Sequence, residues 1–468
     1  MRDILVALLI LAPLPAILVR PHWGALLWLW ISYMNPHRLA WGFAYDFPFA
    51  MVVGVATIAS WLLSREPKRV PWTTTTGLLV VFTLWISVTT MTALAPDLAF
   101  PKWDRTIKIM LGVFIVLGLL QGRSRIMALV WVTAGSIAFY GLKGGLFVIA
   151  TAGQYRVSGP ADSFMADNNH AAVALLMALP LLQYLRQNAG RRWIRLCLLG
   201  VMGLTVLAIL GTYSRGAMIG LGTVALLLWL KSRRKVLMAA GMGMAVALAV
   251  SFMPTQWSER IESAAGYQED SSAQGRFDAW AHALTVAVNR PLTGGGFGTF
   301  SPDVFAQYSP GVDWRAAHSI YFEVLGEQGF IGLAIFLGIG IAAYRSGTWV
   351  QRNVREHSEF RWAGELARML QVSIAGYAAG GAFLSLGYFD LYYGLVAIMI
   401  LTRVAVGQFL TQSNRSGTEA PSSRGLATKG HLAQLGLARS RPAIAPADPS
   451  HSRGTRNAAT PPAAGGVG

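Results

Sequence analysis

Arg215 lies in a short polar turn between two strongly apolar stretches of the chain. The turn reads GTYSRGA over residues 211–217. A guanidinium carries forked N–H donors that match a pair of phosphate oxygens, so this arginine is a candidate anion clamp. The competing interpretation is a side chain that reaches lipid headgroups or pairs with a carboxylate, because an unpartnered arginine at a lipid boundary is costly.

A second arginine, Arg276, lies in a polar stretch that reads AQGRFDAW over residues 273–280 and leads into 281–288, which has helical character. The same phosphate-binding chemistry is available to it. Asp278 follows two residues later, so a surface ion pair is the competing interpretation.

His318 opens a run that reads HSIYFEVLGEQG over residues 318–329. On a helix, Phe322 and Leu325 share a stripe with the histidine, while Glu323 and Glu327 share another face at i and i+4. A histidine with an unperturbed pKa of about 6.5 can act as a neutral general base near pH 7. A structural histidine at a membrane interface is the competing interpretation.

Other polar clusters carry weaker signals. Residues 293–298 read TGGGFG, which lacks the lysine and the preceding strand of a phosphate-binding loop, so a plain turn is favoured. Residues 167–170, DNNH, end another polar stretch. No histidine and carboxylate cluster has metal-ligand spacing, and no Asp-rich motif indicates a magnesium diphosphate site. We expect neither a metal nor another cofactor.

The elements that position these residues must sit in lipid. Of the 468 residues, 54% are hydrophobic and 13% are charged, a balance that is not typical of a soluble globular protein. The net charge of +17 comes from Lys and Arg that cluster in short loops between apolar stretches, which reports membrane topology and excludes a nucleic-acid partner.

Apolar stretches long enough to form membrane helices recur up to about residue 408. The predicted spans are Ile4–Val19, Trp23–Tyr33, Phe47–Leu63, Gly77–Leu94, Ile107–Leu120, Ile126–Ala150, Ala171–Leu185, Trp193–Gly211, Ala217–Leu230, Val236–Phe252, Phe330–Ala343, Met369–Leu386 and Tyr388–Ala405. We expect an all-α polytopic membrane protein with about twelve transmembrane helices, because Ile4–Tyr33 forms either a hairpin that dips partway into the membrane or one span.

Basic loops set the orientation of the predicted spans. Residues 65–69, 121–125, 186–195, 231–235 and 345–361 alternate correctly if all face the cytoplasm. The segments 95–106, 151–170, 212–215 and 253–328 then face outward. The last is the largest of these, and it carries more Asp and Glu than Arg, as the rule requires.

The two ends of the chain differ in character. The apolar start contains Pro13 and Pro15 and has no convincing cleavage site, so it is interpreted as a retained membrane segment. Residues 411–468 are rich in Ser, Gly, Pro, Ala and Arg, which predicts a disordered basic cytoplasmic tail. The single cysteine, Cys197, excludes a disulfide within the chain.

Four motifs taken in chain order resemble the O-antigen ligase and polymerase superfamily. They are SRG at 214–216, GRFDAW at 275–280, GGGFGTF at 294–300, and HSIY at 318–321 continuing to EQG at 327–329. Near the start, MNPHR at 34–38 and WGFAYD at 41–46 resemble the branch of exosortase-associated O-glycosylation ligases. Many members have asparagine after the histidine, where this chain has Ser319.

The resemblance implies a GT-C-like glycosyltransferase of the bacterial inner membrane. Residues 1–410 would form the transmembrane ligase domain, and 253–328 its periplasmic catalytic loop. The implied activity transfers a glycan from undecaprenyl diphosphate to an acceptor at the periplasmic face, without a metal. The favoured acceptor is lipid A–core oligosaccharide.

The same resemblance gives each candidate residue a role. Arg215 and Arg276 would bind the donor diphosphate and stabilise it as it leaves. His318 would take the proton from the acceptor hydroxyl in an inverting displacement. Residues that could orient the histidine or contact the acceptor are Ser319, Tyr321, Glu323 and Glu327.

Three other functions stay open at this point. An O-antigen polymerase, or a ligase for a protein or exopolysaccharide acceptor, would share the donor site and differ only in the acceptor. A lipid-linked oligosaccharide flippase belongs to another class, and it would require charged residues near mid-membrane and an internal repeat, neither of which the sequence shows clearly.

Overall fold

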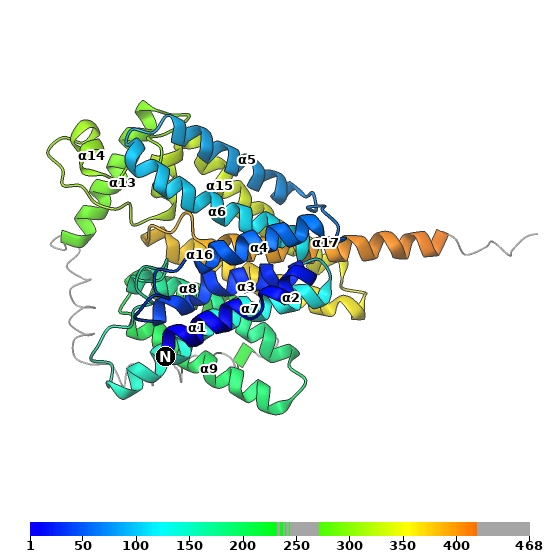
Figure 1. The fold of residues 1–468 in the computed structure, drawn as a ribbon. Helices are drawn as coiled ribbons and strands as arrows, with labels where there is room; N and C mark the ends of the chain where they lie inside the picture. Colours follow the sequence, from blue (N-terminus) through cyan, green and yellow to red (C-terminus); the bar gives the residue numbers. More distant parts are fainter. Residues whose placement is uncertain (232–234, 237–238, 240–242, 244–270, 419–468) are drawn as a thin grey trace, which may run out of the picture. The chain divides into compact units, whose positions relative to one another are not determined.

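The described part of the chain is built from helices. The computed structural model describes residues 1–231 and 271–418, together with 235, 236, 239 and 243. Every regular element within these residues is an α-helix or a 3-10 helix, so the all-α prediction is confirmed for them (Figure 1). The predicted span Val236–Phe252, the loop residues 253–270 and the tail residues 419–468 lie outside the described residues, apart from 236, 239 and 243.

Most elements are long α-helices joined by short segments. The α-helices are α1 (Arg2–Leu11), α2 (Leu14–Val19), α3 (Pro21–Met34), α4 (Phe49–Leu63), α5 (Thr74–Met91), α6 (Pro96–Leu119), α7 (Arg123–Ala150), α8 (Asn168–Asn188), α9 (Arg192–Gly211), α10 (Arg215–Lys231), α13 (Ser271–Asn289), α14 (Pro302–Tyr308), α15 (Ile320–Asn353), α16 (Arg361–Gly380) and α17 (Asp390–Thr418). The 3-10 helices are η1 (Pro36–Leu39), η2 (Ser358–Phe360) and η3 (Gly381–Phe383).

Six helical segments of the described part are long and apolar enough to cross a membrane. They are Arg2–Val19, Thr74–Met91, Arg123–Ala150, Arg192–Gly211, Ile320–Asn353 and Asp390–Ser413. Other predicted spans also coincide with helices, but these are shorter, like the 15-residue α4, or more polar, like α6. The chain is therefore a multi-pass membrane protein, and the total of about twelve spans stays a prediction.

The outer surfaces of the helices differ from their interior in a way that fits a lipid surrounding. Large apolar side chains lie on the outside of the helices. Leu63, for example, has 87% of its surface exposed. By contrast, α8 is buried on nearly every face, because α7, α9, α10 and α16 all pack against it. Apolar exposure on this scale is stable in lipid, where the hydrophobic penalty of water is absent.

The N-terminal helices form a hairpin. The backbone leaves helical geometry at Arg20, and α2 packs back against α3. The Asp3 carboxylate accepts hydrogen bonds from the backbone N–H groups of Gly42 and Ala44, which follow the far end of α3. The beginning of α1 and the end of α3 therefore lie at the same end of the helices, as two antiparallel segments require.

The α15 helix contains a break that divides it into a short and a long part. Gly329 has φ +68° and ψ −173°, which no helix accommodates. The short part, 320–328, carries the polar run that follows His318, and the apolar part begins at the predicted start of the span, Phe330. The break separates the segment with chemically active groups from the segment that crosses the membrane.

The described part of the large loop is folded against the membrane helices. Figure 1 shows α13 and α14 at one end of the molecule, where α13 packs on α15. At the other end of the chain, α17 continues past residue 411 to Thr418, into the segment that the sequence assigns to the tail.

Candidate active site

His318 is held at the start of α15 by contacts from two other parts of the chain. Its backbone N–H donates to Ser385 Oγ at 2.8 Å, and the preceding carbonyl of Ala317 accepts from Trp280 Nε1 at 2.9 Å. The backbone of His318 adopts φ +45°, which is uncommon for a residue with a side chain. Since such a conformation persists only where the surroundings impose it, the fold commits the histidine to one direction.

The α13 helix brings Arg276 to the histidine. The ring of Trp280 stacks on Phe322 of α15 with centroids 4.9 Å apart and planes 9° from parallel. Arg276 precedes Trp280 by one helical turn, so both side chains leave the same face of α13. The positive charge of Arg276 lies close enough to lower the pKa of His318.

A second cation beside the histidine, Arg315, escaped the sequence analysis. Its side chain crosses α13 at Gly275, where an added Cβ would lie 2.5 Å from Arg315 Cδ and 2.6 Å from Nε. The arginine therefore lies beside Arg276, and its charge also lowers the pKa of His318. The available signal was an arginine only three residues before a candidate base, in a loop that otherwise favours acidic residues.

The protonation state of His318 follows from this environment. Partial burial of the ring lowers its pKa below the ordinary 6.5, and the charge of Arg276 adds to the effect. Asp167 acts in the opposite direction, while His170 and Arg315 lower the pKa further. The net effect is a lowered pKa, so the imidazole is neutral at pH 7 and able to accept a proton.

The polar segment 167–170 lies between the histidine and the turn that carries Arg215. The Asp167 carboxylate caps α8 by accepting from the N–H groups of Asn169 and His170. Asn168 Nδ2 donates to the carbonyl of Thr212 at 2.7 Å, which fixes the turn before Arg215. The sequence marked this segment only as the polar end of a loop, and the structure makes it part of the site.

Arg215 lies near the beginning of α15 through the contacts of η3, which packs against both α10 and α15. It is the first residue of α10, and its side chain is exposed. The next residue, Gly216, packs against Phe383 of η3, while the neighbouring Gly381 packs against Ile320 at the start of α15. Arg215 and His318 thus flank one segment. The described charged groups that shift the pKa of His318 include Arg276 but not Arg215.

Comparison with protein families matches two long segments of the chain. Residues 200–337 match a family described as O-antigen ligase, and residues 1–190 match a family of unknown function. The match over residues 200–337 supports a relationship of the chain to the O-antigen ligase superfamily. No curated protein matches the sequence. The ligase match contains all three of the residues Arg215, Arg276 and His318, whereas Asp167 and His170 come from the other matched segment.

Glu323 and Glu327 have a partner that the sequence did not reveal. Lys102 Nζ of α6 lies 2.8 Å from Glu323 Oε1 and 2.8 Å from Glu327 Oε1. The two carboxylates are 7% and 2% exposed, while the lysine keeps 34% of its side-chain surface exposed. The second Glu323 oxygen accepts from the N–H of Gly387 at 2.8 Å.

These contacts give the two glutamates a holding role in the fold. Burial alone would lower the pKa of Lys102, but the charges of Glu323 and Glu327 outweigh it and raise the pKa. The lysine is therefore a permanent cation that ties α6 to the short part of α15. Its signal in the sequence was a lysine in the outward segment 95–106, against the positive-inside bias.

The remaining predicted contact residues of the ligase superfamily motif are engaged within the fold. Tyr321 Oη donates to the carbonyl of Ala378 at 2.8 Å, which ties α15 to α16. Ser319 is buried and precedes the first residue of α15, where its carbonyl accepts from the N–H of Glu323. Both positions shape the histidine's surroundings, and a contact of either with an acceptor stays a prediction.

The glycine turn at 294–298 packs against the break in α15. Gly294 has φ +63°, and a Cβ there would lie 2.6 Å from the Gly326 carbonyl oxygen and 2.6 Å from Gly329 N. Gly295 N–H donates to the Gly326 carbonyl at 2.8 Å. The glycines therefore allow two backbones to touch, which agrees with the interpretation as a turn.

His282 is buried within the described part of the large loop. The His282 ring stacks on Phe305 and lies within hydrogen-bond distance of Ser309 Oγ and the Thr299 carbonyl. His282 therefore has a packing role in the described part of the loop 253–328. Among the described residues, no group of three or more His, Cys, Asp or Glu side chains is placed to hold a metal ion.

Proposed function

We propose that this protein is a lipid-linked glycan ligase. It transfers a glycan from an undecaprenyl diphosphate carrier to a lipid A–core oligosaccharide acceptor at the periplasmic face of the inner membrane. The observation that carries the proposal is a histidine with a fixed backbone next to two arginines, at one end of a bundle of membrane helices. The match of residues 200–337 to the O-antigen ligase family supports the same reaction class.

The orientation follows from where the site helices begin and where they end. Site residues lie at the beginnings of α8, α10 and α15, while basic residues lie at the opposite ends, as with Arg191, Lys231 and Arg352. Basic residues favour the cytoplasmic side, so the site faces the periplasm. With the α1–α3 hairpin counted as one span and the predicted span 236–252 included, about twelve helices cross the membrane.

The arginines supply charge stabilisation for the leaving group. Arg276 and Arg315 lie beside the histidine, and Arg215 lies across the 380–385 segment from it. Their guanidinium groups bind the donor diphosphate, whose negative charge grows as the glycosidic bond breaks. Helix beginnings point partial positive charge at the same place. This is the role that a divalent cation has in many other glycosyltransferases.

His318 supplies the proton acceptor for a single displacement. The acceptor hydroxyl oxygen forms a bond to the anomeric carbon, and its proton passes to the neutral imidazole. The bond between that carbon and the diphosphate oxygen breaks, and the electron pair leaves with the diphosphate. Direct attack from the opposite side inverts the configuration of the anomeric carbon.

The test is reconstitution of the purified protein in liposomes with an undecaprenyl-diphosphate-linked glycan. The acceptors offered are lipid A–core, a protein and the lipid-linked glycan itself, so that ligation and polymerisation give different products. We expect product on lipid A–core that persists after chelation of divalent cations. Product on another acceptor would reassign the substrate, and labelled donor that crosses the membrane without any product would contradict the ligase.

Arginine variants test the clamp within the same assay. Arg276→Ala and Arg215→Ala should each reduce transfer. Arg192→Ala, at the exposed beginning of α9 on the opposite end of the helices, should leave transfer unchanged. Normal turnover in both site variants would remove the diphosphate clamp from the mechanism.

A further inference from the structure

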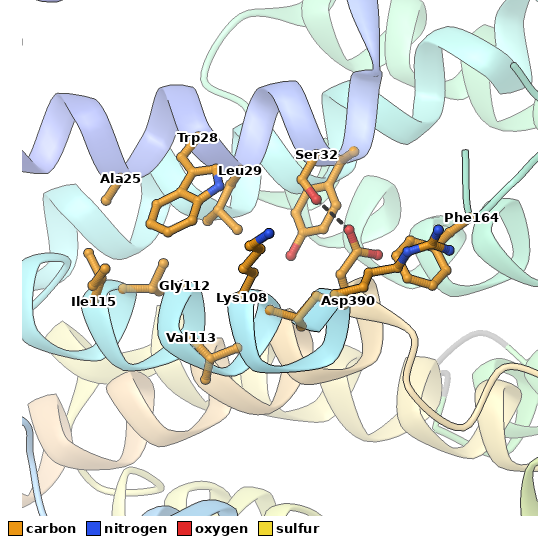
Figure 2. A pocket seen from close by; sticks show the side chains of 14 residues that line it. Ala25, Trp28, Leu29, Ser32, Lys108, Gly112, Val113, Ile115, Phe164 and Asp390 are labelled. Atoms are coloured by element: carbon orange, nitrogen blue, oxygen red, sulfur yellow. Dashed lines mark hydrogen bonds between the residues drawn. The ribbon is translucent and has the colours of Figure 1, made fainter. Parts of the chain in front are cut away.

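An elongated cavity lies between α3 and α6. It encloses about 200 Å³ and is bounded by those two helices together with Phe164 and Asp390. Figure 2 shows Ala25 and Ile115 at one end, and Asp390 and Phe164 at the other. Along α6 the lining runs from Arg105 to Val116, a length of roughly 16 Å at about 1.5 Å per residue.

The two ends of this α3–α6 cavity differ in chemistry. The end toward Ala25 and Val116 is lined by apolar side chains, including Trp28 and Leu29. Figure 2 shows the polar groups Ser32, Lys108 and Asp390 at the other end or in the middle. Arg105 begins the α6 lining, eleven residues before Val116. A cavity that is apolar at one end and charged at the other matches a molecule with a hydrocarbon chain and an ionic head.

Arg105 is the cation that is available to such a head. Asp390 is already engaged, because Ser32 Oγ donates to its carboxylate and Leu391 N–H donates to the other oxygen. Lys108 pairs with Asp104 at 2.6 Å. Arg105 has no carboxylate within ion-pair distance in the described part of the chain, and its guanidinium lies 5.6 Å from the Phe164 ring. An anionic head would therefore find one uncompensated guanidinium.

The charged end of the cavity adjoins the candidate active site. Phe164 lies in the loop that ends at Asp167, whose charge acts on His318. Phe164 also packs against Phe389, which follows Tyr388, and the Tyr388 ring lies 5.0 Å from Lys102 Nζ. A lipid seated here with its head at Arg105 would have that head at the Phe164 end of the cavity, three residues before Asp167.

We propose that this cavity holds the isoprene units nearest the diphosphate of the lipid-linked donor. The assignment rests on the proposed function and adds the place where the carrier chain binds. One chain fits better than two, because the cavity encloses only about 200 Å³ and α3 and α6 also contact each other directly. A two-chain phospholipid would need a wider opening, so an ordinary membrane lipid is not the assigned occupant.

Gly112 offers a direct way to fill the cavity. It lines the space, and a Cβ added there meets nothing within 4 Å. Gly112→Leu therefore places a side chain in the cavity without forcing the backbone to move, and leucine is a better helix former than glycine. Gly135→Leu is the matched control, because Gly135 lies in the middle of α7, is exposed and also has open space.

The experiment uses undecaprenyl monophosphate with a photoreactive group in the isoprene units next to the phosphate. This probe carries no glycan, so its binding is independent of transfer. We expect labelling of α3 and α6 in the purified protein, reduced at least about tenfold in Gly112→Leu and unchanged in Gly135→Leu. Equal labelling of the Gly112→Leu variant, or equal competition by phosphatidylglycerol, would overturn the assignment.

Two further readouts separate this assignment from the proposed function. Arg105→Gln should weaken labelling by the monophosphate but not by the corresponding uncharged polyprenol, and equal weakening of both would overturn the role of Arg105. Expected labelling in a protein that transfers no glycan would leave the cavity assigned and remove the ligase. Normal transfer together with normal labelling in Gly112→Leu would leave the ligase in place and remove the cavity assignment.

Discussion

Two polar clusters occupy the beginning of α15 and its surroundings, and they are built in opposite ways. His318 keeps an exposed side chain, and cations surround it without a direct ion pair in the described contacts. Two turns further on, Glu327 is 2% exposed and bonded to Lys102. An exposed group with uncompensated charges around it can bind and react, whereas a buried and fully paired group holds position.

The comparison shows how one short helix can serve both purposes. The Lys102 network fixes the segment 320–328 against α6, and the break at Gly329 isolates that segment from the membrane-spanning part. The histidine then projects from a rigid base. Changes at the His318 cluster should therefore affect glycan transfer, and changes at the Lys102 cluster should affect thermal stability.

The largest effect is expected on catalysis from His318→Gln. General base catalysis contributes about 10²- to 10⁴-fold, and transfer should fall by that order. Thermal stability of the purified protein should stay near that of the wild type, because the side chain is exposed. Similar losses of stability and transfer would break the distinction between a reacting and a holding cluster.

Replacement of Lys102 should, by contrast, lower the thermal stability of the protein. Lys102→Met leaves two buried carboxylates without their cation, and it should destabilise the protein by about 1–3 kcal/mol, at the low end for buried pairs because the lysine is one-third exposed. The thermal midpoint in detergent measures this. Adding Glu323→Gln and Glu327→Gln should recover part of the loss, and a triple variant less stable than Lys102→Met would contradict the charge argument.

The glycine turn gives a smaller test of the holding region. Gly294→Ala puts a side chain at φ +63° and also into the backbone of residues 326–329, so it should cost more than the roughly 1–2 kcal/mol expected from conformation alone. Gly311→Ala is the control, because Gly311 has φ +83° but open space around it. Equal losses of thermal stability in the two variants would show that the backbone contact contributes nothing.

The smallest expected effect is a shift in the pH dependence of transfer. The pKa of His318 is below 6.5, so the proton-accepting form is present at pH 7 and is lost as the pH falls through that pKa. Removing a nearby positive charge with Arg276→Gln should raise the pKa and move the acid limb of kcat/KM to higher pH.

Asp167→Asn should move the same limb to lower pH, because it removes a negative charge while asparagine can still cap α8. Opposite shifts in the two variants would identify His318 as the titrating group. Shifts in the same direction, or none, would assign the acid limb to another residue.

Much of the helical architecture was readable from the sequence. Each predicted span within the described residues overlaps a helix, and the predicted start at Phe330 falls at the break in α15. Two spans fit less closely, because Ile4–Val19 is interrupted between α1 and α2 and Met369–Leu386 runs past the end of α16 at Gly380. These features are local, because a membrane helix satisfies its own backbone and needs only a long apolar stretch. The pairing of Glu323 and Glu327 at i and i+4 on one face was readable for the same reason.

The sequence by itself thus determined the helices, their apolar and basic ends, and the identity of the histidine and arginines as candidate groups. Only the tertiary structure decided their partners. Lys102 is 221 residues from Glu323, and no spacing rule connects them. Likewise, the Arg315 side chain packs across α13 at Gly275, where a residue with a Cβ atom would clash with it. Such contacts depend on which helices pack together, and packing is set by the whole fold.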